Sequence, residues 1–189
     1  DIAACQPRSR AYDGDVVQIT TERGNSLTAT PNHMLFARMS DRTDLHYVYL
    51  MYKRGVGYRV GLVQSARYDS IYGVPTSGLA IRGNQEKADK VWILRVCDAK
   101  AEATFWEQYF AFKYGIPTTV FHTAGRKMSL DQQQVDRLYA AIDTEERAAR
   151  LMADLLISPD HPHHRPKGIA GDREIDRIAV QVRMFGDKR

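Results

Sequence analysis

The chain of 189 residues is poor in cysteine, with two in all, and has no long uninterrupted apolar run. Cys5 and Cys97 are far apart and form no C-x-x-C pair, so we expect no disulfide framework and interpret both thiols as inert or buried. No stretch approaches the roughly 20 apolar residues that a membrane-spanning helix needs. No signal peptide is recognised at Asp1. These absences predict a cytoplasmic protein with no membrane partner.

Neither sign of charge dominates, because 27 Lys and Arg against 23 Asp and Glu give a net charge of +4. This excess permits contact with nucleic acid but does not require it. Two interpretations of the basic residues stay open, a phosphate-binding face and ordinary surface charge. The residues concerned are Arg8, Arg10, Lys53, Arg54, Arg59 and Arg67.

The first forty residues have the pattern of a β-hairpin followed by a sharp turn. Val16–Thr20 and Ser26–Thr30 alternate as strands do, with turn residues before and between them. Pro31 removes a backbone donor and ends the second strand. We therefore expect Thr30 and His33 to be held in fixed orientation at the end of a strand, with apolar residues on both sides.

This stretch resembles the second conserved block of an intein, a protein-splicing domain with the Hint fold. T-P-N-H at 30–33 carries the resemblance, after D-G-x-V-x-x-I at 13–19 and G-x-x-L-x-A-T at 24–30. The resemblance implies that Thr30 and His33 grip the peptide bond at the N-terminal splice junction and assist an acyl shift there without a cofactor. It implies flanking host segments (exteins) as partners. The overall pattern, including residues 184–189, is similar to that of inteins inserted in DNA helicases, which implies a helicase as the host.

A second pattern occupies residues 45–120. It predicts a hairpin of Tyr47–Tyr52 and Tyr58–Val63, a third strand at Lys90–Cys97, and a helix at 99–114 capped by Asp98. Residues 77–90 are polar and contain glycine, so we predict a loop there. A set of aromatic side chains is expected in the core, consisting of Trp92, Phe105, Trp106, Tyr109 and Phe110.

This order of elements resembles the GIY-YIG nuclease module. The resemblance implies that Tyr49, Arg67 and Glu107 contribute to metal-dependent cutting of a phosphodiester, with Glu107 as the ligand of one Mg²⁺. Glu107 lies among aromatic residues, where a carboxylate needs a metal ion or hydrogen bonds.

The sequence departs from this module at two positions. Tyr47 replaces the glycine of the first motif, and Arg59 stands where the second motif has its tyrosine. The neighbouring Tyr58, the remaining candidate, faces the opposite side of the strand. We interpret the unit as degenerate, nuclease-like in shape and either inactive or a contact surface for DNA.

The C-terminal part is predicted to be helical and then extended. A capping box at 129–132 opens a helix to about Ile142, and Asp143 opens another. The histidines of His161–His164 lie in a proline-rich stretch that we interpret as a solvated linker rather than a metal site. A closing strand at Ile178–Phe185 is expected to pair with the opening hairpin.

Together these patterns predict an α+β protein. It has β-rich Hint-like segments at 1–40 and 166–189, an inserted α/β unit at 45–120, and a helical extension and linker at 121–165. We expect a fragment of an intein that cannot splice alone, since the chain begins with Asp1 and ends with Arg189 and so has neither splice junction. The alternative is a DNA-binding or metal-dependent DNA-cutting domain of the homing-nuclease type.

Overall fold

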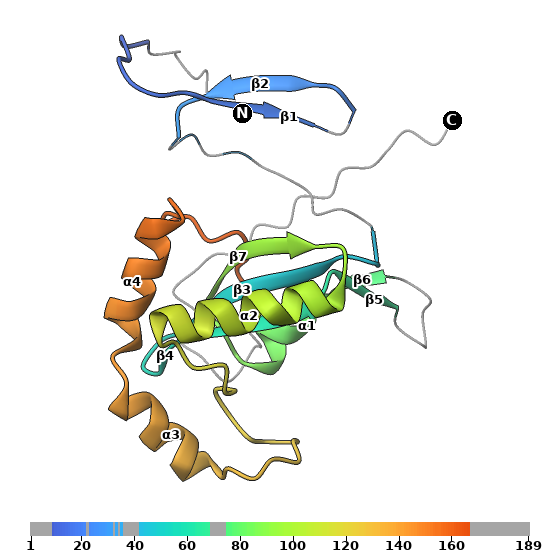
Figure 1. The fold of residues 1–189 in the computed structure, drawn as a ribbon, viewed down its shortest axis with the longest axis vertical. Coiled ribbons are helices and arrows are strands. Elements are labelled where there is room, and N and C mark those ends of the chain that lie inside the picture. The colour runs from blue at the N-terminus through green and yellow to red at the C-terminus, as the bar shows by residue number, and fades with distance from the viewer. Residues whose placement is uncertain are drawn as a thin grey trace, which may run out of the picture. The chain divides into compact units, whose positions relative to one another are not determined.

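The structure is a computed structural model that describes residues 9–21, 23–31, 33, 35, 42–68 and 75–166. The chain has a mixed α+β fold and divides into two compact units, residues 1–38 and residues 39–189 (Figure 1). Within the described residues, none of the helices combines the length and the apolar character needed to span a lipid bilayer.

The first unit contains the predicted hairpin. β1 (Val17–Thr20) pairs antiparallel with β2 (Ser26–Ala29), and the chain reverses through a turn in which Gly24 takes a φ of 81°. The side chains of Ile19 and Leu27 face each other in register, and both are exposed. Two strands with exposed apolar side chains are at best marginally stable in water.

The second unit is organised around a three-stranded antiparallel sheet in the order β4-β3-β7. β3 (His46–Lys53) is central, β4 (Gly57–Gln64) follows it through a tight turn, and β7 (Lys90–Cys97) pairs on the other side. The three strands predicted in this part of the sequence are therefore confirmed, with bounds that differ by at most one residue. A small ribbon of β5 (Ala66–Tyr68) and β6 (Pro75–Ser77) extends from β4.

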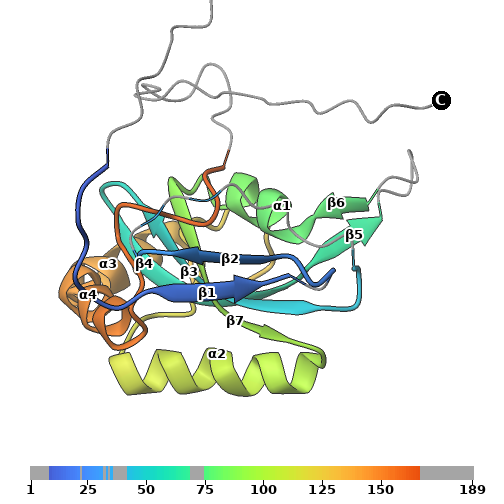
Figure 2. The same cartoon turned by 90° about the horizontal axis from the view of Figure 1, so that it is seen from above.

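Helices cover both faces of this sheet because the strands alternate apolar side chains on the two sides (Figure 2). Val48 and Leu50 belong to one core, packed against α2 (Lys100–Tyr114) and α4 (Thr144–Asp154). The other core lies on the opposite face, toward α1 and α3, and consists of Leu45, Tyr47, Tyr49, Met51, Val63, Leu79, Ala88, Val91, Phe121, Val135 and Tyr139.

The loop predicted at 77–90 is wrong, because α1 (Gly78–Gln85) lies there. Leu79 is fully buried and anchors this helix in the second core. Gly78 is required for close packing, since a Cβ atom at that position would overlap the backbone oxygen of Gln64. The glycine therefore permits a close approach to β4 instead of breaking the helix.

Two expectations for α2 are corrected. Asp98 does not cap it, because the N-cap is Ala99 and no side chain caps the helix there. Phe105 and Tyr109 are not core residues, with exposed fractions of 60% and 40%, whereas Phe110 is buried as expected. The helix carries two aromatic stripes, and only the stripe that faces the sheet is covered.

The two remaining helices begin at acidic caps. The capping box of α3 (Gln132–Ala141) is formed by Asp131 and Gln134, two residues later than predicted. In α4 the side chain of Asp143 accepts hydrogen bonds from the first turn, as expected. The two helices contribute to different cores, α3 through Val135 and α4 through Leu151.

The segment after α4 is not simply a solvated linker. Val91 and His164 form an antiparallel bridge with N–O distances of 2.9 and 3.0 Å, and the backbone N–H of Ile93 donates to His163 Nδ1 at 2.8 Å. These contacts cover part of the outer edge of β7. The predicted closing strand at 178–185 lies outside the described residues.

Candidate functional site

The predicted splicing residues lie where β2 ends. Thr30 is half-buried, and the backbone N–H of His33 donates to the Thr30 carbonyl at 2.9 Å, which closes a tight turn around Pro31. The His33 side chain is exposed. The turn therefore holds the two residues close in space, with the imidazole accessible from solvent. Asn32 lies outside the described residues.

Tyr49 is buried on the face of the sheet that α1 covers. Its ring lies over Gly61 on the paired strand, where any Cβ atom would overlap the phenol. Arg59 Nη1 donates to Tyr49 Oη at 3.0 Å, and Arg59 Nη2 donates to the Thr118 carbonyl at 2.7 Å. Burial raises the pKa of the Tyr49 hydroxyl, while the positive charge of Arg59 opposes this shift. Tyr49 is therefore a neutral hydroxyl at physiological pH.

The carboxylate of Glu86 connects α1, β4 and the loop that follows α2. It is fully buried at the C-cap of α1, and its Oε2 accepts the backbone N–H of Phe121 at 2.9 Å. Its Oε1 lies 2.7 Å from Arg126 Nη2, 3.5 Å from Arg59 Nη1 and 3.9 Å from Arg82 Nη1. The C-terminal end of a helix carries partial negative charge and disfavours a carboxylate. The three guanidinium groups offset this cost.

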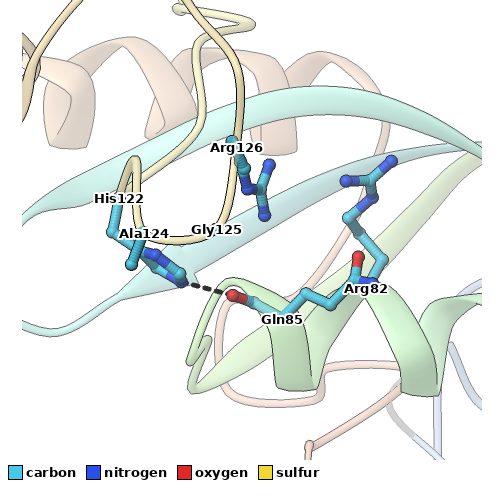
Figure 3. Close-up of a pocket in the computed structure, with 6 residues that line it drawn as sticks. All are labelled: Arg82, Gln85, His122, Ala124, Gly125 and Arg126. Carbon is cyan, nitrogen blue, oxygen red and sulfur yellow. Dashed lines mark hydrogen bonds between the residues drawn. The ribbon is translucent and has the colours of Figure 1, made fainter.

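An open pocket of about 340 Å³ lies beside this cluster (Figure 3). Its walls come from α1 and from the loop that follows α2, and they consist of Arg82, Gln85, His122, Ala124, Gly125 and Arg126. The loop is tied to α1 at His122 and contains a closed turn. His122 Nε2 is hydrogen-bonded to the backbone oxygen of Gln85, and the N–H of Arg126 donates to the Thr123 carbonyl at 3.0 Å. Gly125 takes a φ of 73° in this turn, which favours glycine.

Glu107 lies on α2 near the outer edge of β4. Its carboxylate accepts the backbone N–H of Leu62 and is within electrostatic range of Arg59 and Arg82. Burial raises the pKa of Glu107, and these three groups partly oppose the shift. The carboxylate at this position thus has a hydrogen-bond donor and positive neighbours.

The nuclease-type residues whose side chains are described, Tyr49, Tyr58 and Glu107, do not converge on one point. Tyr58 packs beside Tyr52 and Trp92 on the face opposite Tyr49, and burial raises its pKa to about 12. Arg67 lies on β5, paired in register with Thr76. The structure describes its backbone but not its side chain. Among Tyr49, Tyr58 and Glu107, whose side chains are described, Tyr49 and Glu107 have a common neighbour, Arg59.

A metal-binding geometry is not found in the described ranges, where no group of three or more His, Cys, Asp or Glu side chains is suitably arranged. Cys97 is a buried free thiol, and burial raises its pKa, as an inert role requires. Cys5 lies outside the described residues.

Sequence reasoning missed Glu86, Arg82, His122 and Arg126. The signal that was available is Arg59, which occupies an inward-facing position among apolar residues of β4. A buried arginine requires an acidic partner. Nothing in the spacing indicates which of the 23 acidic residues is that partner.

Comparison of the chain with protein-family models, with curated proteins and with solved structures gives no match.

Proposed function

We propose that this chain is part of an intein, in which residues 1–38 contribute the Thr30/His33 block of a splicing domain and the second unit is an inserted module. The observation that carries the proposal is the division of the chain. A hairpin that ends in a T-P-x-H turn forms a unit separate from the α/β unit. An insertion into a splicing domain produces such a division.

The exposed apolar side chains of the hairpin also support the proposal that it belongs to a larger splicing domain. Val17 and Leu27 are 45% and 46% exposed, so the hairpin requires further strands to cover it. We propose that Ile178–Phe185 supplies one of them.

The chemistry expected of the turn is activation of an amide. A planar peptide bond resists attack because its resonance must be lost. Hydrogen bonds from His33 and Thr30 to the scissile peptide would distort it and stabilise the oxyanion that develops when an upstream Cys or Ser attacks. Histidine also transfers protons near neutral pH. The partners are the flanking host segments, which we propose belong to a DNA helicase in the cytoplasm.

The test is N-terminal cleavage in the complete open reading frame that encodes this chain. We expect His33→Ala to slow the formation of the cleaved product about 100-fold, and Thr30→Ala to slow it less. Thr28→Ala is the matched control, because Thr28 lies on the same exposed strand, two residues from the turn. Cleavage by His33→Ala at the rate of the Thr28→Ala control would refute the proposal.

The geometry does not favour the alternative of a metal-dependent nuclease. A Mg²⁺ ion at Glu107 would lie near two guanidinium groups and would compete with the N–H of Leu62 for the carboxylate. We therefore rank the nuclease second to the splicing proposal. The matching test is nicking of duplex DNA in Mg²⁺ by the chain and by Glu107→Gln, and nicking that only the unmodified chain performs would restore the nuclease proposal.

A further inference from the structure

We infer that the pocket between α1 and the loop 121–126 is a binding site for a phosphate group. The inference concerns the second unit alone and is independent of splicing. It rests on the charge of the pocket, on the direction of its arginine side chains and on the way they are supported.

The pocket has more positive than negative charge. Among the described residues, Arg59, Arg82 and Arg126 surround the carboxylate of Glu86, and Glu107 is a further acidic group near Arg59 and Arg82. These five groups, three guanidiniums and two carboxylates, carry a net charge of +1. An anion that enters the pocket would neutralise it.

The arginine side chains at the pocket are only partly covered. The side chains of Arg82 and Arg126 are 27% and 20% exposed, whereas that of Arg59 is 7% exposed. Figure 3 shows Arg82 rising from α1 and Arg126 extending from the opposite loop, with both guanidinium ends directed to the space between them. Arg59 and Glu86 form the buried base of the cluster, and Arg82 and Arg126 form its accessible rim.

Two guanidinium groups at one pocket favour phosphate over carboxylate. A carboxylate has two oxygens and satisfies one guanidinium fork, whereas a phosphate group has enough oxygens to accept from two forks at once. The pocket volume of about 340 Å³ lies within the usual range for small-ligand sites, so it admits the group together with part of its ester.

The Arg126 side of the rim is pre-organised, which reduces the entropy lost on binding. Arg126 is held at 2.7 Å from Glu86, and the turn through Gly125 fixes the backbone behind it. Arg82 belongs to a regular helix turn and lies 3.9 Å from the same carboxylate oxygen. Because this contact is long, Arg82 can turn toward a ligand while Glu86 keeps Arg59 and Arg126.

The test is a titration of the full chain with inorganic phosphate and, separately, with a short DNA duplex. Binding is followed through the side-chain Nε–Hε resonances of Arg82 and Arg126. We expect saturable shifts of both resonances and about a tenfold loss of affinity in Arg82→Gln. Arg126→Lys, which keeps the charge but loses the fork, should also weaken binding.

Lys127→Gln is the matched control, because it removes the same charge from an exposed position on the same loop outside the pocket. It should change affinity by less than about twofold. A response to inorganic phosphate identifies a free phosphate group as sufficient, and a response to the duplex alone identifies the phosphodiester of a nucleic acid. The inference fails if neither ligand shifts the two arginine resonances, or if Lys127→Gln weakens binding as much as Arg82→Gln. If a variant does not fold, the inference is judged by whether either ligand shifts the Arg82 and Arg126 resonances of the unmodified chain.

Discussion

Arg126 Nη2 lies 2.7 Å from Glu86 Oε1, and this ion pair joins the loop after α2 to the C-terminal end of α1. Glu86 is fully buried, and its second oxygen is bonded to the backbone of the same loop through Phe121. The carboxylate therefore fixes both the position of the loop and the orientation of the arginine. The shape of the pocket therefore depends in part on this side chain.

Removal of the Glu86 charge should destabilise the second unit strongly. Glu86→Gln keeps the size of the side chain but leaves three guanidinium groups around a neutral amide, and breaking a buried pair in this way costs about 3–5 kcal/mol. The free energy of unfolding in urea measures the effect. Asp44→Asn breaks the exposed pair with Arg42 and should leave stability unchanged. Equal stability of the two variants would contradict the role given to Glu86.

The two aromatic stripes of α2 predict opposite outcomes for two phenylalanines two residues apart. Phe110 is 4% exposed in the core, and Phe110→Ala should cost about 3–5 kcal/mol of unfolding free energy. Phe112 is 81% exposed, and Phe112→Ala should change stability by less than about 0.5 kcal/mol. Thermal or urea unfolding of the two variants distinguishes the stripes. A large loss in Phe112→Ala would mean that this residue packs against another part of the protein.

The strands of the sheet could be predicted from the sequence because their alternation is strong and local. Val48 and Leu50 face one core while Tyr47 and Tyr49 face the other, and this period of two is visible in the sequence itself. The helix α1 could not be predicted in this way. Gly78 is a poor helix residue in isolation, and its reason for being there is the nearby backbone of β4, which is distant in sequence.

The candidate pocket could not be predicted from the sequence either, because it too depends on contacts between residues that are distant in the chain. Glu86 is 27 residues from Arg59 and pairs with it only because α1 packs beside β4. For two aromatic residues of α2 the sequence instead predicted burial that the structure does not have. Phe105 and Tyr109 have the composition of a core, but the sheet covers only one side of the helix and they lie on the other.

The contact between His163 and β7 predicts a dependence of stability on pH. The N–H of Ile93 donates to His163 Nδ1 at 2.8 Å, so this nitrogen must be unprotonated in the folded state. Desolvation of the ring lowers the pKa of His163 below its usual value of 6.5. Since the unfolded chain takes up the proton first as pH falls, the contribution of this contact is complete above about pH 6.5 and decreases between that pH and the lower folded-state pKa.

The measurement is hydrogen-exchange protection of the Ile93 amide between pH 8 and pH 5. Protection should decrease at the acidic end by the equivalent of one hydrogen bond, about 1 kcal/mol. His163→Gln keeps an acceptor oxygen but does not titrate, so its protection should vary less with pH than that of the unmodified chain. His161→Gln removes a nearby exposed histidine and should behave like the unmodified chain. If His163→Gln retains the full pH dependence, another group controls this edge of the sheet and the assignment to His163 is wrong.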